Sequence, residues 1–230
     1  MNIDSSQIIW LFYQSGFGGD QLYYLLNKTG QFAYPNNQCT KLDSKGKRDV
    51  HDLFDSNFHF HPYLGSGNLL KWNCSNWQSL KSILEHYLSR YDNLNLDKPI
   101  IIKGHVYFSE LEIRKMAPNS KIIYINTDND PGDYFRLALH KNQGLPGFPN
   151  LDYDDQIKFY RITVSKLRSY YRHGFEILAE DYFSNSLIMW QALSKYLGID
   201  LTSCHLEHAE YANIHKYYFE QQHALTRNTA

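Results

Sequence analysis

The chain has 230 residues, long enough for one sizeable hydrophobic core. Its hydrophobic content of 43% is typical of a globular protein, and its net charge of −1 gives no electrostatic reason to expect nucleic acid or an anionic membrane as a partner. Its three cysteines form no paired motif, and no apolar run approaches the length of about 18 residues that a membrane span needs. We therefore expect a soluble, cytoplasmic protein in a reducing compartment.

The stretch from Ile8 to Asn27 is typical of a strand, a glycine-rich loop and a helix. Residues 8–13 are apolar and rich in β-branched and aromatic side chains, which predicts a buried strand. Three glycines fall within residues 15–19, and leucines then recur at helical spacing. A glycine loop that opens a helix can hold an anion, because backbone N–H groups point at it. A tight turn without a ligand is the alternative.

Strands and helices alternate along the rest of the chain. This alternation predicts an α/β protein with a mainly parallel central sheet between helices, and ligands at the carboxyl ends of the strands. We expect one domain over residues 1–230, with histidines 205, 208 and 215 on the surface. The expected elements are an irregular insert at about 31–78, helices at 77–88, 109–116, 131–140, 152–172, 184–197 and about 205–224, strands at 100–102, 121–126 and 175–179, and a loop at 143–150.

Three separated stretches each carry a different motif: FYQSGFGGDQL at 12–22, IIIKGH at 100–105 and KIIYINTDNDPGD at 121–133. In order and spacing they resemble the donor loop, the Lys-x-His strand and the 3′-phosphate element of sulfotransferases. A later segment, 175–200, resembles the last strand, turn and closing helix of that family. These enzymes use 3′-phosphoadenosine 5′-phosphosulfate (PAPS) on a P-loop kinase-like fold, so the resemblance implies that three-layer α/β/α fold and PAPS as donor, without a metal.

The resemblance also implies roles for particular residues. His105 is the expected general base and Lys103 the expected cation on the sulfuryl oxygens. An imidazole titrates near neutral pH, and side chains two apart on a strand share a face. Donor contacts are implied for Gln14, Ser15, Gly16, Phe17, Gly18, Gly19, Asp20, Thr127, Asn129 and Arg136.

The donor motifs depart from the family pattern at several positions. Gln14 replaces the loop lysine, Phe17 and Gly18 replace hydroxyl residues, and Thr127 or Asn129 stands where an arginine holds the 3′-phosphate. Asp20 would repel the donor unless it only caps the helix. A lost charge-assisted contact costs ~1.5–3 kcal/mol, so losing lysine and arginine weakens donor binding by roughly two to four powers of ten.

Three functions remain open. The first is sulfuryl transfer from PAPS to a hydroxyl or amine of a small molecule, glycan or peptide. The second is a non-catalytic module of the same fold that binds a nucleotide or a protein. A nucleotide kinase or nucleoside-triphosphate hydrolase ranks third, because no lysine follows Gly19 as G-x-x-x-x-G-K-[ST] requires.

Overall fold

The computed structural model describes residues 3–14, 17–33, 73–88, 95–104, 108–134 and 153–213. Four of the predicted site residues lie outside these ranges: Ser15, Gly16, His105 and Arg136. Most of the expected insert, the loop at 143–150 and the end of the final helix also lie outside them.

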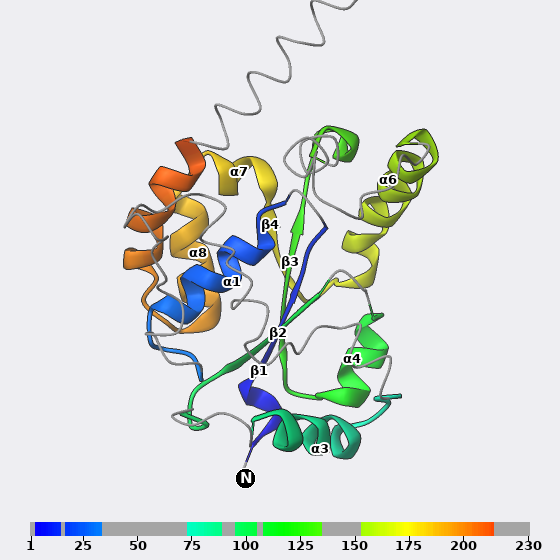
Figure 1. Cartoon of the computed structure of the whole chain (residues 1–230), viewed down its shortest axis with the longest axis vertical. Helices are drawn as coiled ribbons and strands as arrows, with labels where there is room; N and C mark the ends of the chain where they lie inside the picture. Colours follow the sequence, from blue (N-terminus) through cyan, green and yellow to red (C-terminus); the bar gives the residue numbers. More distant parts are fainter. Residues whose placement is uncertain are drawn as a thin grey trace, which may run out of the picture.

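The described core is built on a four-stranded sheet with the order β2-β1-β3-β4 (Figure 1). The strands are β1 (Ile8–Phe12), β2 (Ile100–Gly104), β3 (Lys121–Asn126) and β4 (Phe175–Leu178). All three pairings are parallel, and Leu11 of β1 lies opposite Lys103 on one side and Ile123 on the other. Strands of this kind are buried on both faces, which explains why their sequences are continuous apolar runs rather than alternating patterns.

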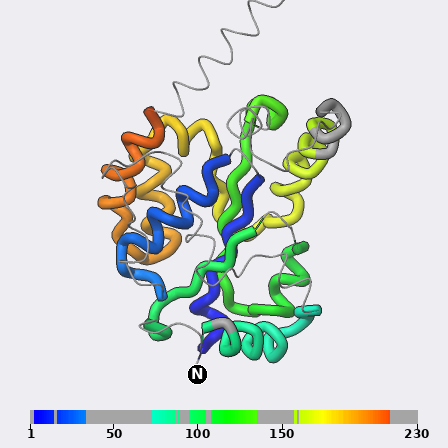
Figure 2. The backbone as a smooth tube through the Cα atoms, in the orientation of Figure 1, coloured from blue at the N-terminus to red at the C-terminus, as the bar shows by residue number. Residues whose placement is uncertain are grey.

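Helices cover both faces of the sheet. On one face lie α1 (Gly19–Lys28), α8 (Leu187–Leu197) and the helical residues 202–213, and on the other lie α4 (Glu110–Met116) and α6 (Tyr153–Tyr170) (Figures 1 and 2). Helix α3 (Trp77–Leu88) packs against α4. The expected α/β fold with a parallel sheet between helix layers is confirmed, as is the passage from β1 through a glycine turn into a helix.

Most predicted boundaries agree with the structure to within a few residues, and the differences have local causes. The predicted turn after β4 is a short helix, α7 (Ala179–Phe183). The following helix begins at Leu187 instead of 184, because Asn185 takes a left-handed conformation with φ 55° and Ser186 caps α8 through the N–H of Met189.

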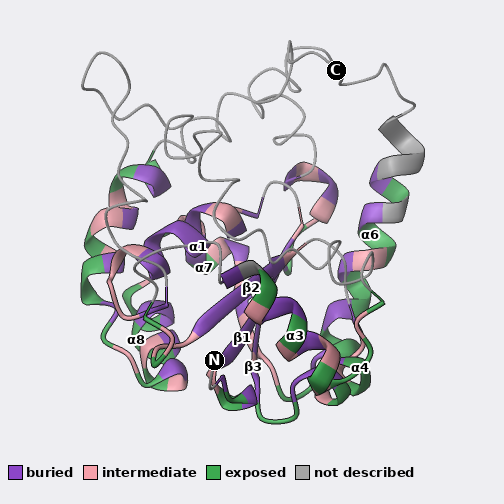
Figure 3. Cartoon of the chain, turned by 60° about the horizontal axis from the view of Figure 1, so that its bottom comes forward, coloured by how far each residue is buried: buried purple, intermediate pink, exposed green. Residues whose placement is uncertain are grey.

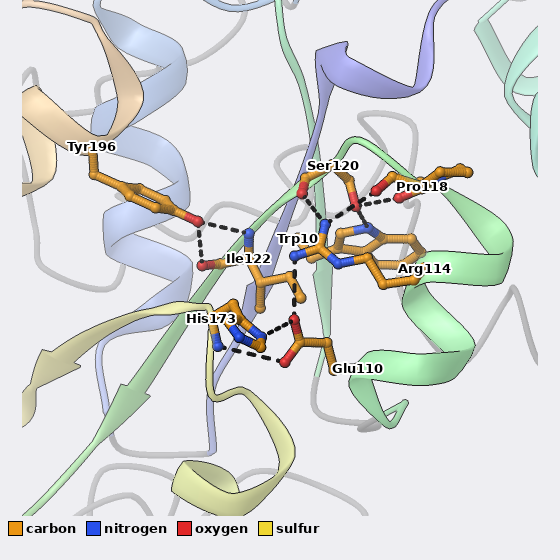
Figure 4. A network of polar contacts seen from close by, with 9 residues as sticks. Trp10, Glu110, Arg114, Pro118, Ser120, Ile122, His173 and Tyr196 are labelled. Carbon is orange, nitrogen blue, oxygen red and sulfur yellow. Dashed lines mark hydrogen bonds and ion pairs between the residues drawn. The ribbon is translucent and has the colours of Figure 1, made fainter.

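β1 is buried throughout and β2 and β3 along most of their length (Figure 3), and a polar network lies at the amino end of β3 (Figure 4). Trp10 donates a hydrogen bond to Ser120 Oγ over 3.0 Å, and Arg114 donates to the carbonyl oxygen of Ser120 over 2.6 Å. The Tyr196 hydroxyl bonds the backbone of Ile122. This edge is therefore occupied by structural contacts. No helix among the described residues is long and apolar enough to cross a membrane.

Candidate functional site

The strand order places the candidate site at the carboxyl ends of β1 and β3. The chain passes from β1 to β2 on one side and then returns to β3 on the other side of β1. In parallel sheets, a ligand crevice forms outside the carboxyl ends of the strands where the order reverses in this way. Helix α1 begins at this edge and α7 lies beside it, at the upper end of the sheet in Figure 1.

The glycine turn is packed tightly between two tyrosines. Gly18 caps α1 with φ 73°, a left-handed conformation that favours glycine, and a methyl group on it would lie 2.7 Å from the Tyr182 ring. A methyl group on Gly19 would overlap the ring of Tyr13. Phe17 is fully buried, and its ring packs edge-on against Tyr134 at 5.0 Å between centroids. Positions 18 and 19 of this turn therefore have no room for a side chain.

Lys103 and Asp20 form an ion pair at the start of α1. The lysine is only 6% exposed at the end of β2, and its ammonium contacts the Asp20 carboxylate. The Tyr13 hydroxyl donates a 2.5 Å hydrogen bond to the same carboxylate oxygen, and the ammonium lies 4.9 Å from the centre of the Tyr23 ring. Lys103 and Asp20, which the sequence analysis assigned to one site, are therefore in contact. Tyr13 joins them, although the sequence analysis had assigned it only to the apolar strand at residues 8–13.

The end of β3 is held by a carboxylate. Thr127 Oγ1 donates to Glu180 Oε1, and the Asn129 N–H donates to that oxygen over 3.1 Å and to Thr127 Oγ1 over 3.0 Å. Burial, followed by the negative charge of Glu180, raises the pKa of Tyr134 to about 12, so this hydroxyl stays protonated at neutral pH. Where the resemblance places a 3′-phosphate, the Thr127 hydroxyl and the Asn129 N–H are therefore already bonded to a carboxylate.

Two arginines of α6 reach the turn after β3 and pair with carboxylates there. Arg161 donates to Asp130 Oδ1 over 2.7 Å. Arg168 donates to Asp128 over 2.6 Å and to Glu176 over 2.7 Å. These contacts fix the turn against α6. The described residues contain no group of three or more side chains suited to a metal ion.

A buried histidine supports the glycine turn from behind, which corrects the expectation that His208 lies on the surface. It is 0% exposed, stacks on the Tyr182 ring at 4.1 Å between centroids, and bonds the Tyr182 carbonyl through Nε2 over 2.7 Å. Its Nδ1 lies 3.1 Å from Gln21 Oε1, which also accepts the Tyr182 hydroxyl. The network therefore joins α1, α7 and the helical residues 202–213.

Burial lowers the pKa of His208 from its ordinary 6.5 to about 4, and this predicts a loss of stability in acid. Between these pH values the unfolded chain binds a proton that the native chain excludes, so the free energy of unfolding falls as the pH falls, by up to about 3 kcal/mol. Urea unfolding at pH 7.5 and 4.5 measures this loss. His208→Gln should flatten the dependence, and parallel curves for the two proteins would contradict this role for His208.

Among the described site residues, contacts join Lys103 with Asp20 and Thr127 with Asn129. Gln14 accepts the backbone N–H of Phe17 over 3.1 Å through its own carbonyl. The sequence analysis did not identify Glu180 as a partner of the turn after β3. Its position directly after the strand expected at 175–179 placed it at the edge of the sheet where a site was expected. The supporting role of His208 was also missed, although its helical spacing from Cys204 and Tyr211 places it on the buried face of residues 202–213.

No protein-family model and no curated protein sequence matches the chain. Among solved structures, the chain is similar to mouse sulfotransferase SULT7A1 complexed with PAP, with 15% identity and a TM-score of 0.47 over 91% of this chain and 66% of that one. It is also similar to retinol dehydratase with PAP and androsterone, and to retinol dehydratase with PAP and retinol. These two share 14% identity with it, at TM-scores of 0.43 and 0.45, over 92% and 93% of this chain and 65% of theirs. The chain spans about two thirds of the length of these proteins.

Proposed function

We propose that the chain transfers a sulfuryl group from PAPS to a hydroxyl or amine acceptor, at the carboxyl ends of β1 and β3. The observation that carries the proposal is the buried ammonium of Lys103 beside the first turn of α1. A lysine and a helix N-terminus are both positive, so this edge of the sheet favours an anion. Asp20 supplies a negative charge there in the free chain, and a phosphosulfate would bind the same positive groups.

In the proposed reaction, the acceptor oxygen or nitrogen attacks the donor sulfur while His105 takes its proton. The bond from sulfur to the bridging oxygen breaks, and the electron pair leaves with 3′-phosphoadenosine 5′-phosphate (PAP). Lys103 neutralises charge on the sulfuryl and bridging oxygens, and the amides of the turn that ends at Gly19 hold the 5′-phosphate. The acceptor is a small molecule, a glycan or a peptide.

A second candidate is a non-catalytic module of the same fold that binds a nucleotide or a protein. It is favoured by one observation: the two positions expected to meet the donor already have internal partners, since Lys103 contacts Asp20 and Thr127 donates to Glu180. The two functions differ in turnover, because both allow a nucleotide to bind but only the first consumes PAPS.

The test of the donor site is calorimetric titration of the Lys103→Met variant with PAP. Methionine keeps an apolar side chain of similar length but carries no charge, so PAP affinity should fall by about 10- to 100-fold, the value of one charge-assisted contact. Lys115→Met is the matched control, because Lys115 is exposed on α4. Equal affinity in wild type and the Lys103 variant would remove Lys103 from the donor site.

A further inference from the structure

The Lys103 ammonium is already neutralised within the chain. Its side chain is 7% exposed, whereas that of Asp20 is 31% exposed, so the carboxylate is the solvent-facing partner of the pair. A buried ammonium without a counter-charge is strongly unfavourable, and the pair therefore stabilises the free protein.

Three favourable interactions converge on the Asp20 carboxylate. Lys103 supplies a positive charge, and Tyr13 supplies a hydrogen bond of 2.5 Å. Asp20 also lies in the first turn of α1, where the helix dipole favours negative charge and where Gly18 supplies no capping side chain. A phosphate or sulfate group at this edge would bind the same three partners: the Lys103 ammonium, the Tyr13 hydroxyl and the start of α1.

We propose that Asp20 is an internal competitor of the anionic donor and sets the affinity and the anion selectivity of the site. This inference rests on the proposed function. The carboxylate and a phosphosulfate cannot both neutralise the single charge of Lys103, so the donor binds only when Asp20 releases the lysine or when its repulsion is overcome. An anion with a single charge attracts Lys103 too weakly to displace Asp20, whereas a multiply charged phosphosulfate nucleotide attracts it strongly enough.

The neighbouring contacts limit how the exchange takes place. Asp20 follows Gly19, whose backbone lies directly against the Tyr13 ring, so the start of the helix is held in place. The exchange is therefore a rotation of the Asp20 side chain towards solvent, which its partial exposure allows. Tyr13 keeps its ring packing and loses only its hydroxyl partner.

The experiment is a calorimetric titration with PAP of wild type, Asp20→Asn and Asp97→Asn. Asparagine keeps the oxygen that accepts from Tyr13 but removes the charge that competes for Lys103, so affinity for PAP should rise at least about tenfold. Asp97 is exposed before the start of β2, at the opposite edge of the sheet, and its replacement should change affinity less than about twofold. Asp20→Ser is a second neutral variant, to be used if Asp20→Asn fails to fold.

Thermal unfolding of the same proteins gives an independent readout. Without ligand the neutral variant should melt below wild type, because Lys103 stays buried without its counter-charge, and PAP should raise its melting temperature more than that of wild type. If PAP binds wild type and the neutral variant equally, or binds the variant less tightly, Asp20 is not a competitor, although the donor site stands. If PAP binds neither folded protein, the inference and the proposed function both fail.

Discussion

Replacing Gly19 with alanine should destabilise the protein by about 4 kcal/mol, near the upper end of single-residue effects. The added methyl group would overlap the Tyr13 ring, and that ring cannot move freely. Tyr13 is 3% exposed and its hydroxyl is bonded to Asp20. Either the helix start or the tyrosine must shift, and both support the proposed site. Urea unfolding at pH 7.5 measures the loss.

Gly198→Ala is the control for an added methyl group without overlap: nothing lies within 4 Å of the added carbon, although Gly198, unlike Gly19, has a left-handed conformation with φ 73°. Gly198→Ala should lower the free energy of unfolding by only about 1 kcal/mol, which is the cost of placing alanine in a left-handed conformation. In a Tyr13→Ala background, Gly19→Ala should cost much less than in wild type, because the overlapping ring is gone. Similar costs for Gly19→Ala in both backgrounds would show that the tyrosine is not the obstacle.

Replacing His105 with alanine should lower turnover of PAPS by about 10²- to 10⁴-fold and leave the affinity for PAP unchanged. The expectation follows from the place of His105 directly after β2, two residues beyond Lys103. The measurement is the release of PAP from PAPS in the presence of a panel of hydroxyl and amine acceptors. A fall in binding instead of turnover would make His105 a donor-binding residue.

His173→Ala is the control for this experiment. His173 is 80% exposed and contacts Glu110 at the amino edge of the sheet, away from the proposed site, so its removal should leave turnover unchanged. Equal turnover in wild type and the His105 variant would end the assignment of His105 as the base.

Local patterns predicted the fold well, because they report local physics. Continuous apolar runs identified the strands of a parallel sheet, which are buried on both faces. The helix expected at 109–116 forms as α4, and a capping box between Ser109 and Glu112 marks its start. The helix expected at 184–197 ends at Leu197, where Gly198 follows with a positive φ.

The site was less predictable, because its contacts join residues far apart in the chain. Lys103 and Asp20 are 83 positions apart, so no periodicity links them, and the sequence left open whether Asp20 repels a donor or only caps the helix. The burial of His208 depends on Tyr182 and Gln21, which come from two other helices. His208 lies at helical spacing from the buried side chains of Cys204 and Tyr211, but its polar partners on the other helices cannot be read from that spacing.

Calorimetric titration of the wild-type protein with PAP at low ionic strength tests the proposed donor site most directly. Saturable binding at a Kd below about 1 mM is the predicted result, since Lys103 and the first turn of α1 lie at this edge while the carboxylates of Asp20 and Glu180 oppose the ligand. If the folded protein binds no PAP up to millimolar concentrations, it has no donor site of this kind, and a non-catalytic module that binds a protein or a different nucleotide becomes the better explanation of the fold.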